Sequence, residues 1–468
     1  MALAALPAAL GAGAATAGEI AKSEQQKLPS SPGLARVTQY ELLPEDLFPF
    51  AIAAGPERGP PEMWFSVGRG QPGAQVIEQK LEPVVGRISF SGEIREFPLP
   101  YPSIANVPYS LTAGNDGAMW YLRQGAVGRI SRDGQVTELS IDTGDFPVGE
   151  IVSGSDGNLW FTKTDTGAGG VIGPGAIVRL DLSGQATEFP LPGPKGGPEA
   201  IVPGPDGNLW FTELYGKRIG RITPVGAITE FPIGSAPGDI VAGHDGNLWY
   251  SLDGAIGHIS TSGRTFRPIV VENGFGPLAA GPDLRLWYGG AGGLALGRVT
   301  PDGRRSLTEL PKPAVRPVDL ATGTLGSLWY IASAEMNCTG GGGSCMVFRP
   351  TQPAVIGHIQ QIHPVVVVKR RGFSIHPRWA RVRLGCLGGE ALGSCRGELT
   401  LRSRAGVVFG HKRFLIRTDD AATIPIRLLR EGREAVLTGR RLRLVAHVDH
   451  PEGTPTSRGF VVPPKPRP

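Results

Sequence analysis

Short apolar strands separated by Gly-containing turns recur along most of this sequence. One copy is "GPDGNLWFTE", from Gly204 to Glu213, in which an Asp-Gly pair precedes a Trp and an apolar, aromatic run. Asp-Gly favours a tight hairpin because Gly tolerates a positive φ. Similar stretches contain seven of the eight tryptophans, namely Trp64, Trp120, Trp160, Trp210, Trp249, Trp287 and Trp329. The pattern therefore predicts a series of β-hairpins, each with a Trp buried as part of the scaffold.

A second phrase follows six of these copies in full, as in "IGRITPVGAITEFPI" from Ile219, and predicts two more strands per copy. Four short strands repeating at ~40 residues are typical of propeller blades. The seventh copy stops at "IGHIQ" from Ile356, and its missing strand is found near the N-terminus as "VTQYELLP" from Val37. Such a strand would close the ring and remove its exposed edges. We therefore predict an all-β chain with a seven-bladed β-propeller over residues 37–362. Because a closed ring leaves no free sheet edge, we expect a monomer.

The pattern changes after residue 362. Runs such as "RWARVRLGC", "GELTLRS" and "RRLRLVAHVDH" alternate polar and apolar residues over short strands, which is typical of a β-sandwich. We predict a small Ig-like sandwich with a Pro-rich tail over residues 363–468, in which Arg381, Arg383, Arg441 and Arg443 share a solvated face.

Charge separates the two regions. The C-terminal region contains 21 Lys and Arg against 8 Asp and Glu, whereas acidic residues outnumber basic ones before it. A basic surface can attract anionic envelope polymers, phospholipid head groups or nucleic acid. No nucleic-acid-binding motif accompanies it, so we expect no nucleic-acid partner. The alternative is that the arginines keep the sandwich soluble or hold it against the acidic propeller.

The four cysteines form two close pairs, Cys338 with Cys345 and Cys386 with Cys395, each separated by Gly-rich chain. Local pairs of this kind favour disulfides. The alternative is four buried or metal-bound thiols, although neither spacing is that of a zinc knuckle. Disulfides in turn indicate an oxidising compartment.

The N-terminal segment, residues 1–36, combines a signal-peptide-like run with a linker. Residues 1–18 are Ala-rich and apolar and include a small-residue cleavage pattern, although a basic start is missing. No stretch of 18 or more apolar residues is found elsewhere, so no transmembrane span is expected. We expect a secreted or cell-surface protein.

The phrases "GPDGNLWFTE", "IGRITPVGAITEFPI" and "TEFPLP" resemble the blade signature of the virginiamycin B lyase family, over residues 37–361. The resemblance implies a seven-bladed propeller and an activity that opens a cyclic depsipeptide antibiotic by elimination at its ester bond. It also implies Mg²⁺ and a histidine that accepts the proton. A base that removes a proton and a metal that stabilises the resulting charge form a coherent mechanism.

This chain departs from the family pattern at the residues that carry the chemistry. The family's histidine precedes the innermost strand, and no matching position here is histidine: these are Phe50, Tyr109, Gly149, Glu199, Gly238, Gly276 and Val318. The acidic residue that the family uses for the metal, at the end of the "WFTE" strand, is present once, as Glu213. The sequence therefore leaves open whether the chain is an enzyme.

Other candidate groups surround the expected channel mouth. Glu150, Glu199, Asp239 and Asp319 lie just before innermost strands and should converge on one face. Such carboxylates could hold Mg²⁺ or Ca²⁺ or bind cationic or hydroxylated ligands; alternatively, they accept backbone hydrogen bonds or stay hydrated. Phe50 and Tyr109 add aromatic surface for a sugar or ring, with core filling as the alternative.

We therefore expect a secreted or envelope-associated binding propeller, with an envelope polysaccharide or a small cyclic ligand as partner. The alternative is a divergent Mg²⁺-dependent C–O lyase that acts on a cyclic depsipeptide or a polysaccharide.

Overall fold

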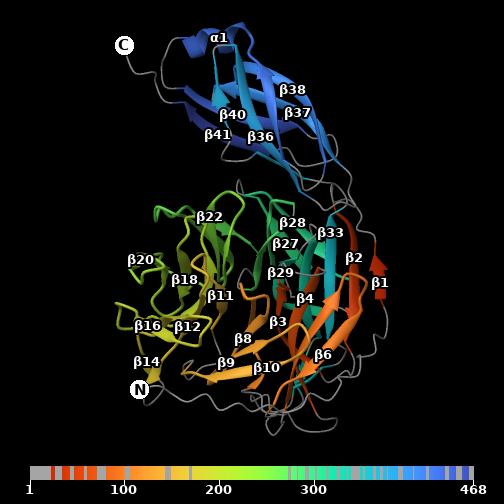
Figure 1. Cartoon of the computed structure of the whole chain (residues 1–468), viewed down its shortest axis with the longest axis vertical. Coiled ribbons are helices and arrows are strands. Elements are labelled where there is room, and N and C mark those ends of the chain that lie inside the picture. Colours follow the sequence, from red (N-terminus) through yellow and green to blue (C-terminus); the bar gives the residue numbers. More distant parts are fainter. Residues whose placement is uncertain are drawn as a thin grey trace.

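The structure is a computed structural model, and Figure 1 shows the whole chain. It describes residues 23–462 with gaps at 27–33, 43–46, 57–60, 71–80, 101–105, 143–148, 168–170, 272–275, 282, 290–294, 301–302, 312–314, 324–326, 335, 339–347, 351–353, 362–364, 369–372, 377, 388–393, 404, 418–420, 438–441 and 450–455. In this part of the chain no helix is long and apolar enough to cross a membrane.

Antiparallel sheets of four strands, paired in chain order, repeat through the described residues up to Gln361. The first three are β3 (Leu47–Ala54), β4 (Glu62–Arg69), β5 (Glu82–Ser89) and β6 (Ile94–Pro98); β7 (Ser110–Ala113), β8 (Met119–Arg123), β9 (Ala126–Ile130) and β10 (Val136–Ser140); and β11 (Ile151–Ser153), β12 (Leu159–Lys163), β15 (Ala176–Leu180) and β16 (Ala186–Pro190). The next three are β17 (Pro198–Pro203), β18 (Leu209–Glu213), β19 (Arg218–Ile222) and β20 (Ile228–Pro232); β21 (Ile240–Ala242), β22 (Asn247–Leu252), β23 (Ala255–Ser260) and β24 (Ile269–Val270); and β25 (Leu278–Ala280), β26 (Leu286–Gly289), β27 (Ala295–Val299) and β28 (Arg305–Glu309).

The last sheet of the series joins the two ends of the repeat. Its strands are β29 (Val315–Gly323), β30 (Ser327–Ala334), β33 (Val355–Gln361), β2 (Leu34–Glu41) and β1 (Ser23–Gln26). Strand β2 pairs with β33, with Val37 opposite Ile359, so the predicted closure by the N-terminal strand is confirmed. Strand β1 extends this sheet outward from within the segment that we expected to be signal peptide and linker.

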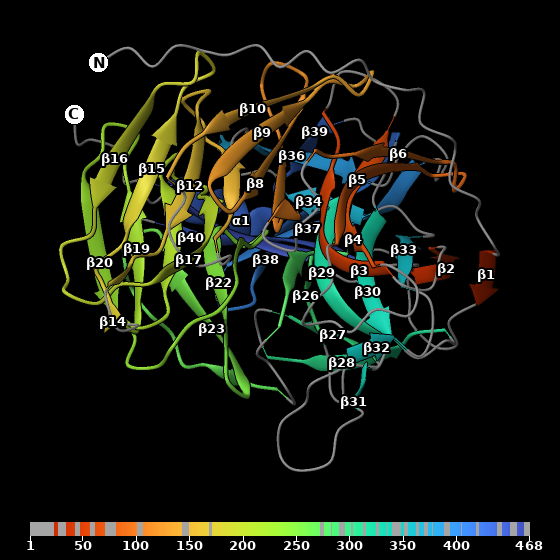
Figure 2. The same cartoon turned by 90° about the horizontal axis from the view of Figure 1, so that it is seen from below.

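The first strands of the sheets enclose a central axis. Strands β3, β7, β11, β17, β21, β25 and β29 each contact the next, and β29 contacts β3, which completes a ring within the described residues. Figure 2 shows the sheets around this axis, seen from the side away from the C-terminal strands. Two short hairpins project from the ring, formed by β13 (Thr166–Gly167) with β14 (Val171–Ile172) and by β31 (Met336–Cys338) with β32 (Phe348–Pro350).

The repeated Trp is held in the same way in successive sheets. Trp210 is fully buried, and its Nε1 donates a hydrogen bond to Asp206 Oδ1 in the hairpin turn at 3.1 Å. The Phe231 ring stacks on it with centroids 5.5 Å apart, and Arg221 Cζ lies 5.7 Å from the Trp ring. The same Trp–Asp bond joins Trp120 to Asp116, Trp160 to Asp156, Trp249 to Asp245, and Trp287 to Asp283. The Asp-Gly-x-x-Trp motif is therefore scaffolding.

Two further sheets share a separate core after residue 364. One contains β34 (Val365–Val368), β35 (Ser374–Ile375), β36 (Trp379–Leu387) and β39 (Ala421–Arg427); the other contains β37 (Ser394–Ser403), β38 (Val408–Arg417), β40 (Leu442–Asp449) and β41 (Thr456–Val462). Buried residues from both sheets pack together, as in a sandwich. The short helix α1 (Arg430–Leu437), which we had not predicted, contacts β38.

The arginines of this sandwich do not all share the face that we predicted. Arg381 and Arg383 are exposed on β36, whereas Arg443 is exposed on β40 in the other sheet. The reason is that β36 and β40 do not pair, so alternation within each strand places their arginines on different outer faces. Arg441 lies outside the described residues.

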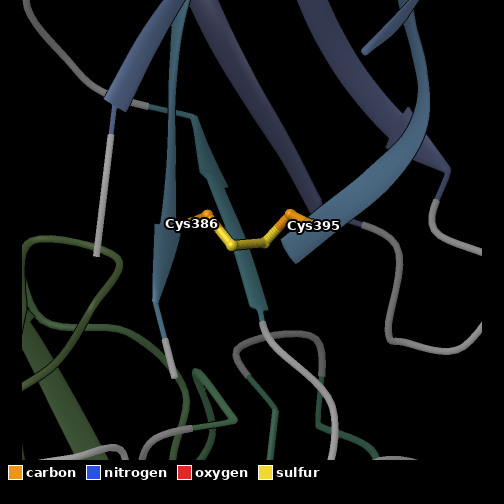
Figure 3. Close-up of a disulfide and its surroundings, with 2 residues drawn as sticks. All are labelled: Cys386 and Cys395. Carbon is orange, nitrogen blue, oxygen red and sulfur yellow. A yellow bond between two sulfur atoms is a disulfide. The ribbon is translucent and has the colours of Figure 1, made fainter. Parts of the chain in front are cut away.

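The disulfide between Cys386 and Cys395 joins the two sheets of the sandwich (Figure 3). Cys386 is on β36 and Cys395 on β37, with Cα atoms 5.7 Å apart. These two strands are consecutive along the chain but belong to different sheets. The pairing of Cys338 with Cys345 remains a prediction, because Cys345 lies outside the described residues.

Replacing Cys386 and Cys395 together by Ser is expected to lower the free energy of unfolding of the sandwich by about 2–3 kcal/mol, because the bond closes a short loop in the unfolded chain. Calorimetry of the full chain would measure the lowered transition temperature. Reductant should lower that temperature in the wild type but leave the double variant unchanged. An unaltered transition in the double variant would contradict the prediction.

Candidate functional site

Four acidic residues lie at one end of the inner strands. Glu150 and Asp239 immediately precede β11 and β21, Glu199 is the second residue of β17, and Asp319 is the fifth residue of the longer strand β29, just after an irregularity in its pairing with β30. All inner strands run in the same direction within the repeat, so these residues lie at the same end of the ring. Each is half-buried. We call Glu150, Glu199, Asp239 and Asp319 the carboxylate rim.

Three of these carboxylates form hydrogen bonds that link one sheet to the next. Glu150 Oε2 accepts a hydrogen bond from the backbone N–H of Ile201 on β17 at 2.9 Å. Asp239 Oδ2 accepts one from Leu278 on β25 at 2.6 Å. Across the closure, Asp319 Oδ2 accepts one from Ile52 on β3 at 2.8 Å. The alternative that these residues accept backbone hydrogen bonds therefore holds for these three.

Glu199 differs from the other members of the carboxylate rim. Its Oε2 atom is buried and has no hydrogen-bond partner among the described residues. Its backbone carbonyl accepts a bond from Thr162 Oγ1 of the preceding sheet at 2.7 Å. Among the four rim carboxylates, Glu199 is therefore the one with a buried oxygen that accepts no hydrogen bond from the described scaffold.

The carboxylate rim is an electrostatically strained group of acids. Burial raises the pKa of Glu150 well above its ordinary value, and the negative charges of the other three rim residues raise it further. Burial raises the pKa of Asp239 to about 7 and that of Asp319 to about 6. Burial also raises the pKa of Glu199. A cation at this rim would relieve repulsion that the protein alone relieves by binding protons.

Replacing Asp239 by Asn is expected to cost less stability at neutral pH than at acid pH. Folding raises the pKa of the Asp239 carboxyl from 3.8 to about 7. The protonated carboxyl therefore contributes its full stability below pH 3.8, and this contribution is lost as the pH rises to about 7. The amide has no such dependence, so the stability difference between wild type and Asp239→Asn should shrink by on the order of 2 kcal/mol over this range.

Calorimetry of both proteins at about pH 4.5 and pH 7.5 would measure this change. Comparison with the variant cancels the contribution of His358, whose pKa is lowered by burial to about 4 and which acts in the opposite direction. A difference in stability that stays constant with pH would show that Asp239 is not strained.

The two aromatic candidates lie near the carboxylate rim but are partly used by the scaffold. Phe50 is half-buried on β3, at an irregularity where the pairing register with β4 shifts. Tyr109 precedes β7, is half-buried, and packs against the buried cluster that contains Leu122. The core-filling alternative therefore applies to Tyr109. Phe50 is the aromatic side chain of the two that is more available for contact with a ligand.

Glu213 does not join the rim. It lies at the end of β18, is fully buried, and pairs with Arg218 on β19, with Oε2 2.9 Å from Nε. Burial raises its pKa to about 7, and the neighbouring Glu230 contributes. In the two preceding sheets this position carries a cation paired to the outer-strand glutamate, Arg123 with Glu138 at 2.6 Å and Lys163 with Glu188 at 3.2 Å. Glu213 thus replaces that cation, and Arg218 supplies the positive charge instead.

The described residues do not fit the magnesium site that the resemblance implies. No three His, Cys, Asp or Glu side chains in the described ranges lie close enough to share a metal ion. Glu213, the family's metal position, is occupied by its ion pair with Arg218. We therefore derive no chemistry through a metal at this site.

The three propeller histidines of the described residues lie away from the carboxylate rim. His244 is in the turn at the far end of β21, with Nε2 2.8 Å from the carbonyl oxygen of Gly281. His258 stacks on Trp249 with centroids 4.3 Å apart, and His358 packs on Trp329 at 4.5 Å. Both occupy the position that Arg has in the other sheets, so they serve the scaffold.

Sequence reasoning missed a set of hydroxyl groups that support the rim. Thr162 Oγ1 accepts a bond from the N–H of Glu150 at 3.0 Å, and Ser251 Oγ accepts one from Asp239 at 2.9 Å. Ser66 and Thr212 act in the same way on β3 and β17. The signal was present, because each of these residues lies two positions after a repeated Trp.

Sheets arranged around an axis, with acidic groups at the start of the inner strands, define a β-propeller. The profile of the virginiamycin B lyase family matches residues 68–176 and 172–340, and the chain belongs to this family. No curated protein matches the sequence.

Solved structures of lyases resemble the chain over its propeller. A streptogramin B lyase is 26% identical, with a TM-score of 0.53, over 69% of this chain and 97% of that one. The virginiamycin B lyase from Staphylococcus aureus is also 26% identical, with a TM-score of 0.53, over 69% of this chain and 98% of that one. A catalytically inactive His-to-Ala variant of the same enzyme, solved with quinupristin, is 25% identical, with a TM-score of 0.53 and the same coverage.

Proposed function

We propose that this protein is an exported binding member of the virginiamycin B lyase family that holds a small cationic ligand at the carboxylate rim. The observation that carries the proposal is the placement of four acids at the same end of the inner strands, of which Glu199 has a buried oxygen with no partner among the described residues. The disulfide between Cys386 and Cys395 supports export.

The positions expected to match the family's histidine carry other residues in this sequence, which favours binding over catalysis. In the sheet of β17 the expected position is Glu199, and the described propeller histidines pack on tryptophans or lie at the opposite end of the ring. A cation beside several carboxylates gains Coulomb energy and lets them ionise at neutral pH. Phe50 adds an apolar surface for the rest of the ligand.

A binding measurement with spermidine as the cationic probe tests this proposal. Replacing Glu199 by Gln should weaken binding roughly tenfold, because a partly buried charge-assisted contact is lost. The matched control is Glu93→Gln, since Glu93 is exposed in the turn between β5 and β6 at the opposite end of the ring.

Calorimetric titration of the full chain would give both affinities. Binding should also weaken as the pH falls below about 6, because the rim carboxyls then bind protons. An absence of saturable binding, or an equal loss in the Glu93→Gln control, would reject the proposal.

A second candidate is a divergent lyase, which membership of the family favours. In that case we propose Glu199 as the base, because burial raises its pKa and the sequence resemblance places it where the family's histidine is expected. Turnover of a streptogramin B substrate separates the two candidates.

A further inference from the structure

The outer face of one sandwich sheet presents a row of unpaired arginines. On β36, Ala380, Val382 and Leu384 are buried in the sandwich core, and the alternating Arg381 and Arg383 are exposed. Arg427 on β39 lies opposite Trp379 and is exposed on the same face. Three guanidinium groups therefore project from two adjacent strands, within a few strand spacings of one another.

No acidic residue balances these charges within the sheet. The strands β34, β35, β36 and β39 contain no Asp or Glu. None of the three arginines forms an ion pair with another described residue; Arg381 instead stacks on the Trp379 ring, with Cζ 4.4 Å from its centre. In the propeller, by contrast, arginines such as Arg123 and Arg218 are paired with glutamates.

The arrangement suits a polymer of oxyanions and hydroxyl groups. An Arg fork binds a carboxylate through two parallel hydrogen bonds, and stacking on an indole ring fixes its orientation before binding. Hydroxyl groups lie beside the cations, since Ser374 on β35 is opposite Arg381 and Thr423 on β39 is opposite Arg383. Cations with neighbouring hydroxyl groups suit a chain of sugars that carries acid groups along its length.

We propose that this face, formed by Arg381, Arg383 and Arg427, binds an acidic polysaccharide that carries uronate carboxylates. The face belongs to the C-terminal sandwich, so it is independent of the carboxylate rim and of any ligand there. A chain with both surfaces holds an anionic polymer by the sandwich and a cationic small molecule by the propeller.

Biolayer interferometry of the immobilised full chain with polygalacturonate tests the proposal. The triple variant Arg381→Gln, Arg383→Gln, Arg427→Gln should bind roughly tenfold more weakly than the wild type, because three charge-assisted contacts are lost. The matched control replaces Arg413, Arg433 and Arg443 by Gln; these are exposed on β38, α1 and β40 of the same sandwich and remove the same charge.

The control triple should keep nearly the wild-type affinity, and neutral dextran should not bind. Equal losses in the two triples would mean that net charge alone attracts the polymer and would overturn the proposal. So would an absence of polygalacturonate binding, or tighter binding to double-stranded DNA or to phosphatidylglycerol vesicles. Glu199→Gln should leave polygalacturonate binding unchanged, so failure here is distinguishable from failure at the rim.

Discussion

Deleting residues 1–42 is expected to abolish the cooperative thermal unfolding of the propeller. This deletion removes β2, which pairs with β33 along its whole length and closes the ring. Val37, Thr38, Gln39 and Tyr40 are all buried there, and Tyr330 donates a hydrogen bond to Gln39 Oε1 at 3.0 Å. Without β2, the edge of β33 and the buried side chains beneath it are exposed to solvent and to other chains.

The matched control deletes residues 1–33 and keeps β2. Of the strands that the structure describes, it removes only β1, a four-residue strand at the outer edge of the closing sheet. Its melting temperature should stay close to that of the full chain, as followed by circular dichroism and size-exclusion chromatography. A well-folded, monomeric 1–42 deletion with an unchanged melting temperature would show that the ring does not depend on this closure.

Replacing Gly220 by Ala is expected to destabilise the propeller by about 3 kcal/mol. Gly220 on β19 lies directly opposite Phe211 on β18, and the Phe211 ring covers the place where a Cβ would be. Strand β18 also pairs with β17, and β19 also pairs with β20, so neither strand can shift without losing hydrogen bonds. The same Gly-under-ring contact recurs at Gly128, Gly257, Gly297 and Gly357.

Gly207→Ala is the matched control, because it changes a glycine in the same sheet without a steric clash. Gly207 has φ of +84°, and a Cβ there would meet no atom within 4 Å, so the cost is about 1 kcal/mol of backbone strain. Chemical denaturation would give both values. Adding Phe211→Leu should recover part of the stability lost in Gly220→Ala, since the ring is removed. Equal costs at the two glycines, with no recovery, would argue against the packing described.

The repeated scaffold could be predicted because each of its contacts is local in sequence. The Asp206–Trp210 bond lies within one hairpin, and an Asp four residues before the Trp recurs in five of the copies, so one of these sheets predicts the others. The closing strand could be predicted for the same reason, because residues after Val37 repeat the pattern of an outer strand. The carboxylate rim followed from its fixed position before the inner strands.

Other features depend on neighbours that the sequence does not place together. Glu213 pairs with Arg218, whereas other sheets have a cation at the position of Glu213 that pairs with an outer-strand glutamate. The sequence of a single strand does not reveal this exchange of partners. Rim carboxylates accept hydrogen bonds from the next sheet, as Asp319 does from the N–H of Ile52, 267 residues away in the sequence. The sandwich lacks a repeat, so neither α1 nor the division of its arginines between two sheets could be inferred from alternation alone.

The two proposed surfaces lie on different parts of the chain. Strand β33 begins at Val355, near the end of the ring that bears the carboxylate rim, and ends at Gln361, at the opposite end, before the sandwich strands start. The rim therefore lies at the end of the ring away from the point where the sandwich begins; in Figure 2, which views the ring from below, the sandwich strands lie behind it. A polymer held by the sandwich would leave the rim open to small molecules.

We propose that this member of the family binds a ligand at the carboxylate rim without opening a cyclic ester. The most direct test incubates the purified full chain with quinupristin and Mg²⁺ and follows linearisation by mass spectrometry, with the Staphylococcus aureus lyase as the positive control. We predict no product above the level of a protein-free sample. Linear product that disappears in Glu199→Gln would contradict this account and establish the chain as a lyase.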